Sequence, residues 1–431
     1  MPLSGFAQRA LWAGPRFGAA FDLLGTGRTV LRGGWGRFYY PIPQFTQGLD
    51  VSAGVRAVNL QTQTTFAQID ATTVGVGDRL SVGAVDRNDS KNPYTDSYSV
   101  TVSQRLPFAS LLEVSYVGNR SRDLLNTGGP LNNINAVPAG ALLRPGLGNP
   151  NDVNPDDFRP LRGFQDFRIV NFGNNFANYN SMQVTWLRTK GRYNIQANYT
   201  LGKQMGIVGN FDEFNLRNNY GVMPSDRRHL FNIAYSIELG DPVRTNKFLK
   251  GLANGWQISG ISQLQSGINL TGNTDGQAFF LNANGFLGAN GFAVSPRTIN
   301  GTDSIALRPR LTCDPRANLG ERQYVNGSCF ALPTRPGENG PTVLPAIYGP
   351  WFQNHDLGLF KNFQISESKR LQFRFNAYNF LNMPLWSFLN GGTNLRLNMS
   401  PTTGQLDNPT FGRVTEKQGR RIVQLAVKFY F

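Results

Sequence analysis

Histidine and cysteine are almost absent from this chain of 431 residues, which has two of each. A zinc site needs about four ligands, and His229 and His355 each lie inside a strand-like segment. We therefore predict no metal and no cofactor. The sequence also lacks a GxSxG nucleophile elbow, a glycine-rich phosphate loop and an HExxH motif, whose residues supply nucleophiles, phosphate cradles and zinc ligands. We expect no enzymatic activity.

Charged residues make up only 16% of the chain, and no apolar run approaches the roughly 20 residues that a membrane helix requires. The mildly negative mean hydropathy is typical of a soluble protein. A membrane β-barrel has the same average, because its strands alternate polar and apolar residues. Disorder is disfavoured, since 31 Phe and 14 Tyr are more aromatics than a disordered chain carries.

Acidic residues are fewer than basic ones, and the net charge is +15. A nucleic-acid footprint needs the basic residues gathered in one patch. Here they are scattered, apart from 226–229 (DRRH) and 417–421 (KQGRR). We predict no nucleic-acid partner, and we expect the arginines at mid-strand to face a barrel lumen, because a cation facing lipid at mid-bilayer costs about 2–4 kcal/mol. The strand cations concerned are Arg32, Arg37, Arg188, Arg374 and Lys428.

Alternation with a period of two residues is the clearest pattern in the sequence, and it places successive side chains on opposite faces of a strand. In the last segment one face carries Val423, Leu425, Val427, Phe429 and Phe431. The same pattern predicts about eleven strands, most of them near the ten residues that a tilted strand needs to cross a bilayer. Their expected spans are 16–23, 28–39, 95–106, 110–120, 181–189, 192–201, 228–239, 255–266, 354–363, 368–381 and 421–431.

The connections between these strands alternate between short turns and long links. Short turns at one end and long loops at the other are typical of an outer-membrane barrel. The longest links, 121–178 and 267–353, are where we expect an extracellular ligand to be captured, because loops on a rigid scaffold carry recognition. The fold class is therefore all-β, a transmembrane antiparallel barrel.

An odd number of sequential antiparallel strands cannot close, and eleven is half of the 22 strands in plugged outer-membrane transporters. The first eleven residues also carry no export signal of the usual composition. We therefore expect residues 1–431 to be the C-terminal portion of a barrel domain, with the plug and N-terminal domains absent.

Several short segments, in order along the chain, resemble the barrel of TonB-dependent transporters, and in particular the Oar-like group with a carboxypeptidase-regulatory-like domain. They are 15–18 (PRFG), 29–39 (TVLRGGWGRFY), 92–95 (NPYT), 112–118 (LEVSYVG), 179–184 (YNSMQV), 226–229 (DRRH), 254–260 (NGWQISG), 264–267 (LQSG), 371–374 (LQFR), 379–382 (NFLN) and 411–414 (FGRV). The series covers nearly the whole chain.

The resemblance implies TonB-dependent import of a bulky nutrient across the outer membrane of a Gram-negative cell. It implies outer-membrane lipid and lipopolysaccharide as surroundings, and the TonB complex as a partner through a plug region missing here. Three rival interpretations stay open: a passive porin-like or structural barrel, an extracellular binding protein, and a truncated fragment without independent activity.

Two features of the sequence have more local interpretations. Val427, Phe429, Tyr430 and Phe431 resemble the C-terminal signal that the β-barrel assembly machine reads, and an alternating terminal strand could be gripped by strand addition. Cys313 and Cys329 share one polar stretch, so an exported protein could join them in a disulfide.

Overall fold

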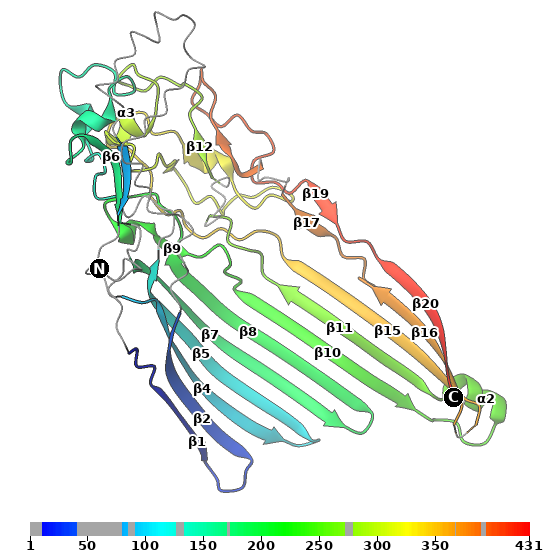
Figure 1. Ribbon diagram of the computed structural model, residues 1–431. Coiled ribbons are helices and arrows are strands. Elements are labelled where there is room, and N and C mark those ends of the chain that lie inside the picture. Colours follow the sequence, from blue (N-terminus) through cyan, green and yellow to red (C-terminus); the bar gives the residue numbers. More distant parts are fainter. Residues whose placement is uncertain are drawn as a thin grey trace, which may run out of the picture.

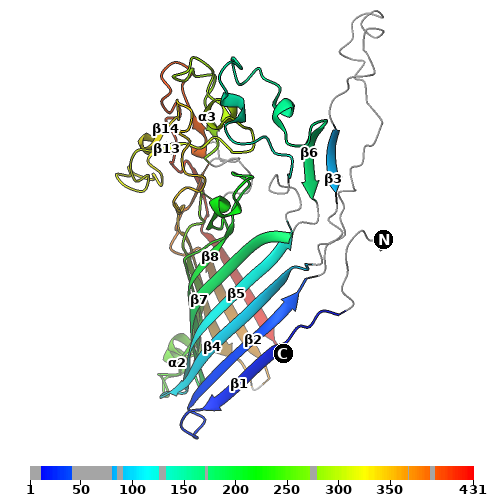
Figure 2. The same ribbon diagram turned by 90° about the vertical axis from the view of Figure 1, so that its left-hand side faces the viewer.

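The computed structural model describes residues 11–40, 80–84, 91–125, 133–169, 173–271, 279–366, 368–388 and 394–431. Its largest element is a twelve-stranded antiparallel sheet. Eleven of the strands follow one another as neighbours in chain order, and the short β9 adds to β8. The sheet is long and curved, with irregular segments gathered beyond one end (Figures 1 and 2).

The eleven sequential strands match the eleven expected segments. They are β1 (Arg16–Asp22), β2 (Thr29–Tyr39), β4 (Tyr94–Leu106), β5 (Ser110–Leu125), β7 (Gly173–Lys190), β8 (Tyr193–Ile207), β10 (His229–Gly240), β11 (Trp256–Gln265), β15 (Phe352–Gln364), β16 (Arg370–Tyr378) and β20 (Ile422–Tyr430). The prediction of an all-β antiparallel barrel sheet is confirmed. The largest extensions beyond the expected spans are in β5, β7 and β8, while β16 is shorter than expected.

The remaining elements are short and lie mainly in the connections. The strands are β3 (Leu80–Ala84), β6 (Phe164–Ile169), β9 (Tyr220–Val222), β12 (Leu281–Asn282), β13 (Arg310–Leu311), β14 (Phe330–Ala331), β17 (Leu385–Ser387), β18 (Leu397–Asn398) and β19 (Glu416–Gln418). The helices are α2 (Lys247–Ala253) and α3 (Pro296–Asn300), with single 3₁₀ turns η3 (Ala141–Leu143), η4 (Pro155–Phe158), η5 (Leu216–Asn219) and η6 (Gly327–Cys329). No helix among the described residues is long and apolar enough to cross a membrane.

The two ends of the sheet differ as the spacing of the strands predicts. Tight turns join β1 to β2, β4 to β5, β7 to β8 and β15 to β16 at one end. Gly25 and Gly191 lie in two of these turns at φ 66° and 61°, a backbone conformation that glycine adopts without steric cost. The connection from β10 to β11 contains α2 at this same end (Figure 1). The long connections leave from the opposite end, and most of the link at 41–93 lies outside the described residues. Glu367, between β15 and β16, also lies outside them.

The two faces of the sheet have different chemistry. Directly opposed residues of antiparallel strands share one face. Along one such row of the register the side chains are all apolar: Leu425, Phe375, Leu359, Ile258 and Ile237.

The row beside it, on the other face, is small and polar: Gln424, Asn376, Gly358, Ser259 and Ser236. The apolar face continues to the far edge of the sheet through Phe231, Tyr199, Val184, Val114, Val102, Leu31 and Phe21.

Large side chains of the apolar face are uncovered by protein. Leu425 is 77% exposed, Val427 58% and Phe21 64%. An apolar surface of this extent on a soluble monomer would be an association site, whereas in a bilayer it is the surface that faces the acyl chains.

The buried apolar core lies in the loops. Its centre includes Phe279, Ile299, Leu397 and Met399, each at most 1% exposed. The parallel pairing of β12 with β18 joins the connection between β11 and β15 to the connection between β16 and β20. We call the described residues of these two connections, 266–271, 279–351, 379–388 and 394–421, the loop cluster; it lies beyond the outer ends of the strands in Figure 1.

Candidate functional site: the polar face and the loop cluster

The polar face is hollowed across strands β8 to β16. A hollow of about 510 Å³ is lined by side chains of this face, among them Asn194, Gln196, Ser236, Asp356 and Asn376. Gly358 lies at its floor, and a Cβ there would come within 2.9 Å of the Phe360 ring. Small and amide side chains therefore leave open space on this face of the sheet, and apolar groups such as Ile261 and Phe360 line it as well.

Hydrogen bonds between strands hold many polar side chains of this face. Gln257 Nε2 donates to Ser236 Oγ at 2.8 Å, and Thr185 Oγ1 donates to Asn198 Oδ1 at 3.1 Å. Such neutral, partnered groups suit a water-filled lumen, where they need no burial to be satisfied. They supply polar groups to this face of the sheet.

The strand cations lie on both faces of the sheet, and their face depends on how far each lies from the strand end. Arg32 and Arg374 point to the polar face, where Arg32 lies 3.4 Å from Glu113. Lys428 shares the polar face with Gln372. Arg37 lies on the apolar face near the outer end of β2, and it donates to both carboxylate oxygens of Asp96, Nε at 2.7 Å.

Arg188 also lies on the apolar face, two residues before the end of β7, with its guanidinium 4.8 Å from the centre of the Tyr193 ring. The expectation that mid-strand cations face the lumen agrees with these positions. The two exceptions lie near strand ends, where a long side chain can reach the interface.

Eight Trp and Tyr residues in or near the strands share the apolar face. They are Trp35, Tyr39, Tyr98, Tyr116, Trp186, Tyr199, Tyr235 and Trp256. Not all of them lie at strand ends, where an amphipathic ring suits the membrane interface. Tyr235 lies at mid-strand over Gly260, where a Cβ would meet its hydroxyl at 2.6 Å. Such a ring fills the gap left by a glycine on the neighbouring strand.

The terminal residues lie on both faces of the last strand. Val427 and Phe429 point to the apolar face, opposite Phe373 and Leu371. Tyr430 points to the polar face, where its hydroxyl accepts from Arg374 Nη2 at 2.9 Å. Phe431 follows the strand and is 92% exposed, 6.0 Å from Phe429 between ring centres. In the described part of the chain, β20 pairs only with β16 and β1 only with β2.

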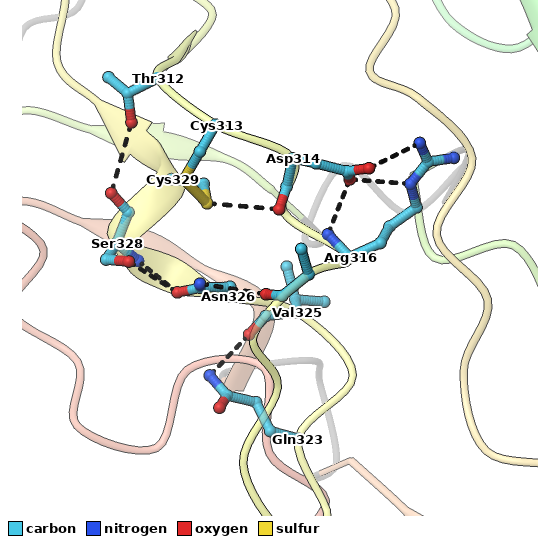
Figure 3. The surroundings of a disulfide bond; sticks show 10 residues. Thr312, Cys313, Asp314, Arg316, Gln323, Val325, Asn326, Ser328 and Cys329 are labelled. Carbon is cyan, nitrogen blue, oxygen red and sulfur yellow. Dashed lines mark hydrogen bonds and ion pairs between the residues drawn. A yellow bond between two sulfur atoms is a disulfide. The ribbon is translucent and has the colours of Figure 1, made fainter.

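A disulfide joins Cys313 and Cys329 within the loop cluster, as Figure 3 shows. Their Cα atoms are 4.9 Å apart, inside the range a disulfide requires. The bond closes the small antiparallel pair of β13 and β14, where Thr312 N also donates to the Cys329 carbonyl at 2.9 Å. Cys329 is fully buried.

The DRRH segment at 226–229 enters β10 as a structural corner. Asp226 is 2% exposed, and its carboxylate accepts from Gln204 N at 2.6 Å and from the Tyr348 hydroxyl at 2.7 Å. His229 stacks between Tyr199 and Trp351. Both residues thus connect loops to strands.

A second polar junction joins three outer loops and was missed by sequence reasoning. Arg159 lies 2.6 Å from Asp156 and 3.0 Å from Asp166. Glu213 lies nearby, and its backbone N–H donates to the Ser304 carbonyl at 3.0 Å. Burial raises the pKa of Glu213 to about 7, the neighbouring Asp166 adds to this, and a hydrogen bond from Ser304 works against it.

No group of three or more acidic, histidine or cysteine side chains with metal-binding geometry occurs among the described residues. Acidic side chains of the loops form other contacts. Asp212, for example, accepts from the backbone of Phe214 at 2.8 Å and of Asn215 at 3.0 Å.

The chain was compared with known families, curated proteins and solved structures. No curated protein matches it. Among solved structures it is similar to the ferric-catecholate import receptor Fiu of E. coli K12, at 8% identity and a TM-score of 0.41, over 96% of this chain and 34% of that one. It is similar to the ferripyoverdine receptor of Pseudomonas aeruginosa, at 8% identity and a TM-score of 0.41, over 97% of this chain and 32% of that one.

A third similar structure is the siderophore receptor PirA from Acinetobacter baumannii, at 8% identity and a TM-score of 0.41, over 97% of this chain and 40% of that one. The chain thus spans about a third of the length of these receptors. A family described as outer membrane beta barrel domain matches residues 3–424. With its two-faced sheet and this match over almost its whole length, the chain belongs to the outer membrane beta barrel domain family, and its location is the outer membrane.

Proposed function

We propose that residues 1–431 are the C-terminal barrel portion of a TonB-dependent importer of the Oar-like kind, which carries a bulky nutrient across the outer membrane. The observation that carries this proposal is the open hollow on the polar face of an eleven-strand path whose two outermost strands lack a second partner among the described residues. The ordered segments from PRFG at 15–18 to FGRV at 411–414 support the family and subtype.

The sheet itself supports a barrel larger than this chain. Each unpaired backbone group at an edge in lipid costs several kcal/mol, so further strands are needed beside β1 and β20. A longer polypeptide would supply them together with a plug filling the polar face. The loop cluster then provides the outer surface on which the nutrient is captured, and the TonB complex supplies the energy through the plug.

The first experiment measures the mass of the native protein in the outer-membrane fraction of its source cells, detected through a C-terminal peptide. We expect a species far heavier than the 47.6 kDa of this chain, with peptides from upstream of Met1. A membrane-embedded species at 47.6 kDa would overturn the plugged importer and indicate an oligomeric passive pore. A barely detectable species would indicate a fragment without activity.

Energy coupling is tested separately by cross-linking in living cells. The native protein should cross-link to TonB, and the yield should fall when the proton gradient is collapsed. Deleting only the proposed plug, while keeping the proposed upstream strands, should abolish the cross-link and leave the protein in the membrane. An undiminished cross-link after that deletion would contradict contact through a plug region.

A further inference from the structure

Arg308 is a buried cation of the loop cluster, and no described residue supplies a counter-charge to it. It is 6% exposed, and its Nε is sealed from solvent without a hydrogen-bond partner. No side-chain hydrogen bond or ion pair joins its guanidinium to any other residue in the part of the chain that the structure describes. Its backbone, by contrast, is held firmly, since Arg308 N donates to Asn339 Oδ1 at 2.8 Å and Gly340 N donates to the Arg308 carbonyl at 3.1 Å.

Arg308 is held in place by an aromatic ring and by backbone hydrogen bonds, and none of these contacts neutralises its charge. The guanidinium lies over the Phe211 ring, 4.4 Å from the ring centre. The segment that carries Phe211 is tied to the segment leading to Arg308, because Ala306 N donates to the Phe211 carbonyl at 2.7 Å. A single aromatic face attracts a cation, yet a buried ion also requires charge and hydrogen-bond partners to replace its water.

Arg159 and Arg308 are both arginines of low exposure in the outer loops, but they differ in their carboxylate partners. Arg159 has two carboxylates within 3.0 Å, those of Asp156 and Asp166. Arg308 has none, and burial lowers its pKa to about 10, which leaves it charged at neutral pH. Arg159 is therefore neutralised by neighbouring carboxylates, whereas Arg308 has no carboxylate partner among the described residues.

We propose that Arg308 is the anchor of an anion-binding site in the loop cluster, which takes a carboxylate or phosphate group of the captured ligand. The fixed fork of a guanidinium suits such groups, because it donates two parallel hydrogen bonds. The inference rests on the proposed function, since it assigns a negative charge to the nutrient.

The test uses the full protein in detergent micelles, with inorganic phosphate and citrate as probes and sodium chloride at equal ionic strength as the reference. We expect each effective anion to raise the melting temperature saturably, since a ligand that binds only the folded state stabilises it. Arg308→Met should abolish the rise. Arg310→Met is the matched control, because Arg310 lies two residues away with a side chain 47% exposed and paired with Glu338.

A saturable rise in melting temperature with phosphate alone, or with citrate alone, identifies the class of anion. Loss of that rise in Arg308→Met, but not in Arg310→Met, supports the site. An equal rise in wild type and Arg308→Met overturns it. Since Arg308→Met removes an unpaired buried charge, it should fold at least as well as wild type in chloride. This binding assay involves neither TonB nor transport, so its failure would leave the importer proposal standing, and failure of the cross-linking test would leave the anion site standing.

Discussion

Tyrosine rings of the apolar face depend on glycines of the neighbouring strand. A Cβ built on Gly118 would lie 2.3 Å from the Tyr98 ring, whose hydroxyl donates to Asn180 Oδ1 at 3.0 Å. Where the ring is held at its far end, it cannot move aside cheaply, because an added methyl group then forces strain on its neighbours.

We expect Gly118→Ala to lower the free energy of unfolding by about 1–3 kcal/mol, the usual cost of overpacking. The measurement is urea unfolding in detergent, followed by tryptophan fluorescence. Gly33→Ala is the control, because the atom nearest to a Cβ there is the Ser99 carbonyl oxygen at 3.6 Å. Equal midpoints for the two variants would contradict the steric argument.

Glu213 makes the outer loops sensitive to pH. Its pKa rises from 4.5 in the unfolded chain to about 7 in the fold, mainly through burial. A raised pKa favours the protonated native state, so its contribution to stability is complete below pH 4.5 and is lost as pH rises through about 7. We expect a loss on the order of 1 kcal/mol between pH 5 and pH 8, after allowing for solvent screening.

Glu213→Gln should flatten this pH dependence in a series of denaturant melts. Glu321→Gln provides the control, since the Glu321 side chain is 84% exposed. A Glu213→Gln protein whose stability still falls between pH 5 and pH 8 as in wild type would assign the effect to another group.

At the scale of elements, β8 alternates between lipid and lumen. Gln196 lies on the polar face beside the hollow, and the next residue, Ala197, lies on the apolar face opposite Ile233 and Trp186. In membranes, we expect Gln196→Cys to react with a small, water-soluble maleimide and Ala197→Cys to be protected by lipid. In detergent-free urea both should react alike. Protection of Gln196→Cys instead would reverse the assignment of the faces.

The disulfide between Cys313 and Cys329 closes a loop of 16 residues in the cluster. Replacing both cysteines by serine should lower the stability of the cluster by about 3 kcal/mol, the value expected from restricting a loop of this length. Limited proteolysis at rising urea concentration measures this loss. A reducing agent should weaken the wild type and leave the double-serine variant unchanged; a resistant wild type would show that the cluster does not depend on the bond.

The strands could be predicted from the sequence because a bilayer imposes alternation on each of them. The extra lengths of β5, β7 and β8 could not, because their outer ends carry polar runs such as Asn174-Asn175 that no bilayer constrains. The core of the loop cluster was missed for a related reason. Phe279 and Leu397 meet through a chain of turns, and their spacing has no period to detect.

For the whole molecule, a prediction concerns the proposed assembly signal on β20. Phe431 is 92% exposed beyond β20, and we propose that it belongs to the signal read by the assembly machine, together with Val427, Phe429 and Tyr430. Phe431→Ser in the full-length gene should reduce the amount of folded protein in the outer membrane several-fold, seen as loss of the heat-modifiable band. Phe21→Ser, which changes a 64% exposed phenylalanine of the same sheet face, should reduce it far less; equal reductions would argue against a special role for the terminus.

The pairing of β12 with β18 has a mechanical consequence. Phe279 N donates to the Leu395 carbonyl at 2.7 Å, and Met399 N donates to the Asn282 carbonyl at 2.9 Å. The strand pairs β11–β15 and β16–β20 are thus connected at two places. One is the β15–β16 ladder, and the other is the β12–β18 pairing in the loop cluster. A force applied to either strand pair is shared between these two connections. The four strands should therefore move as one rigid unit, and the barrel should deform at other strand pairings.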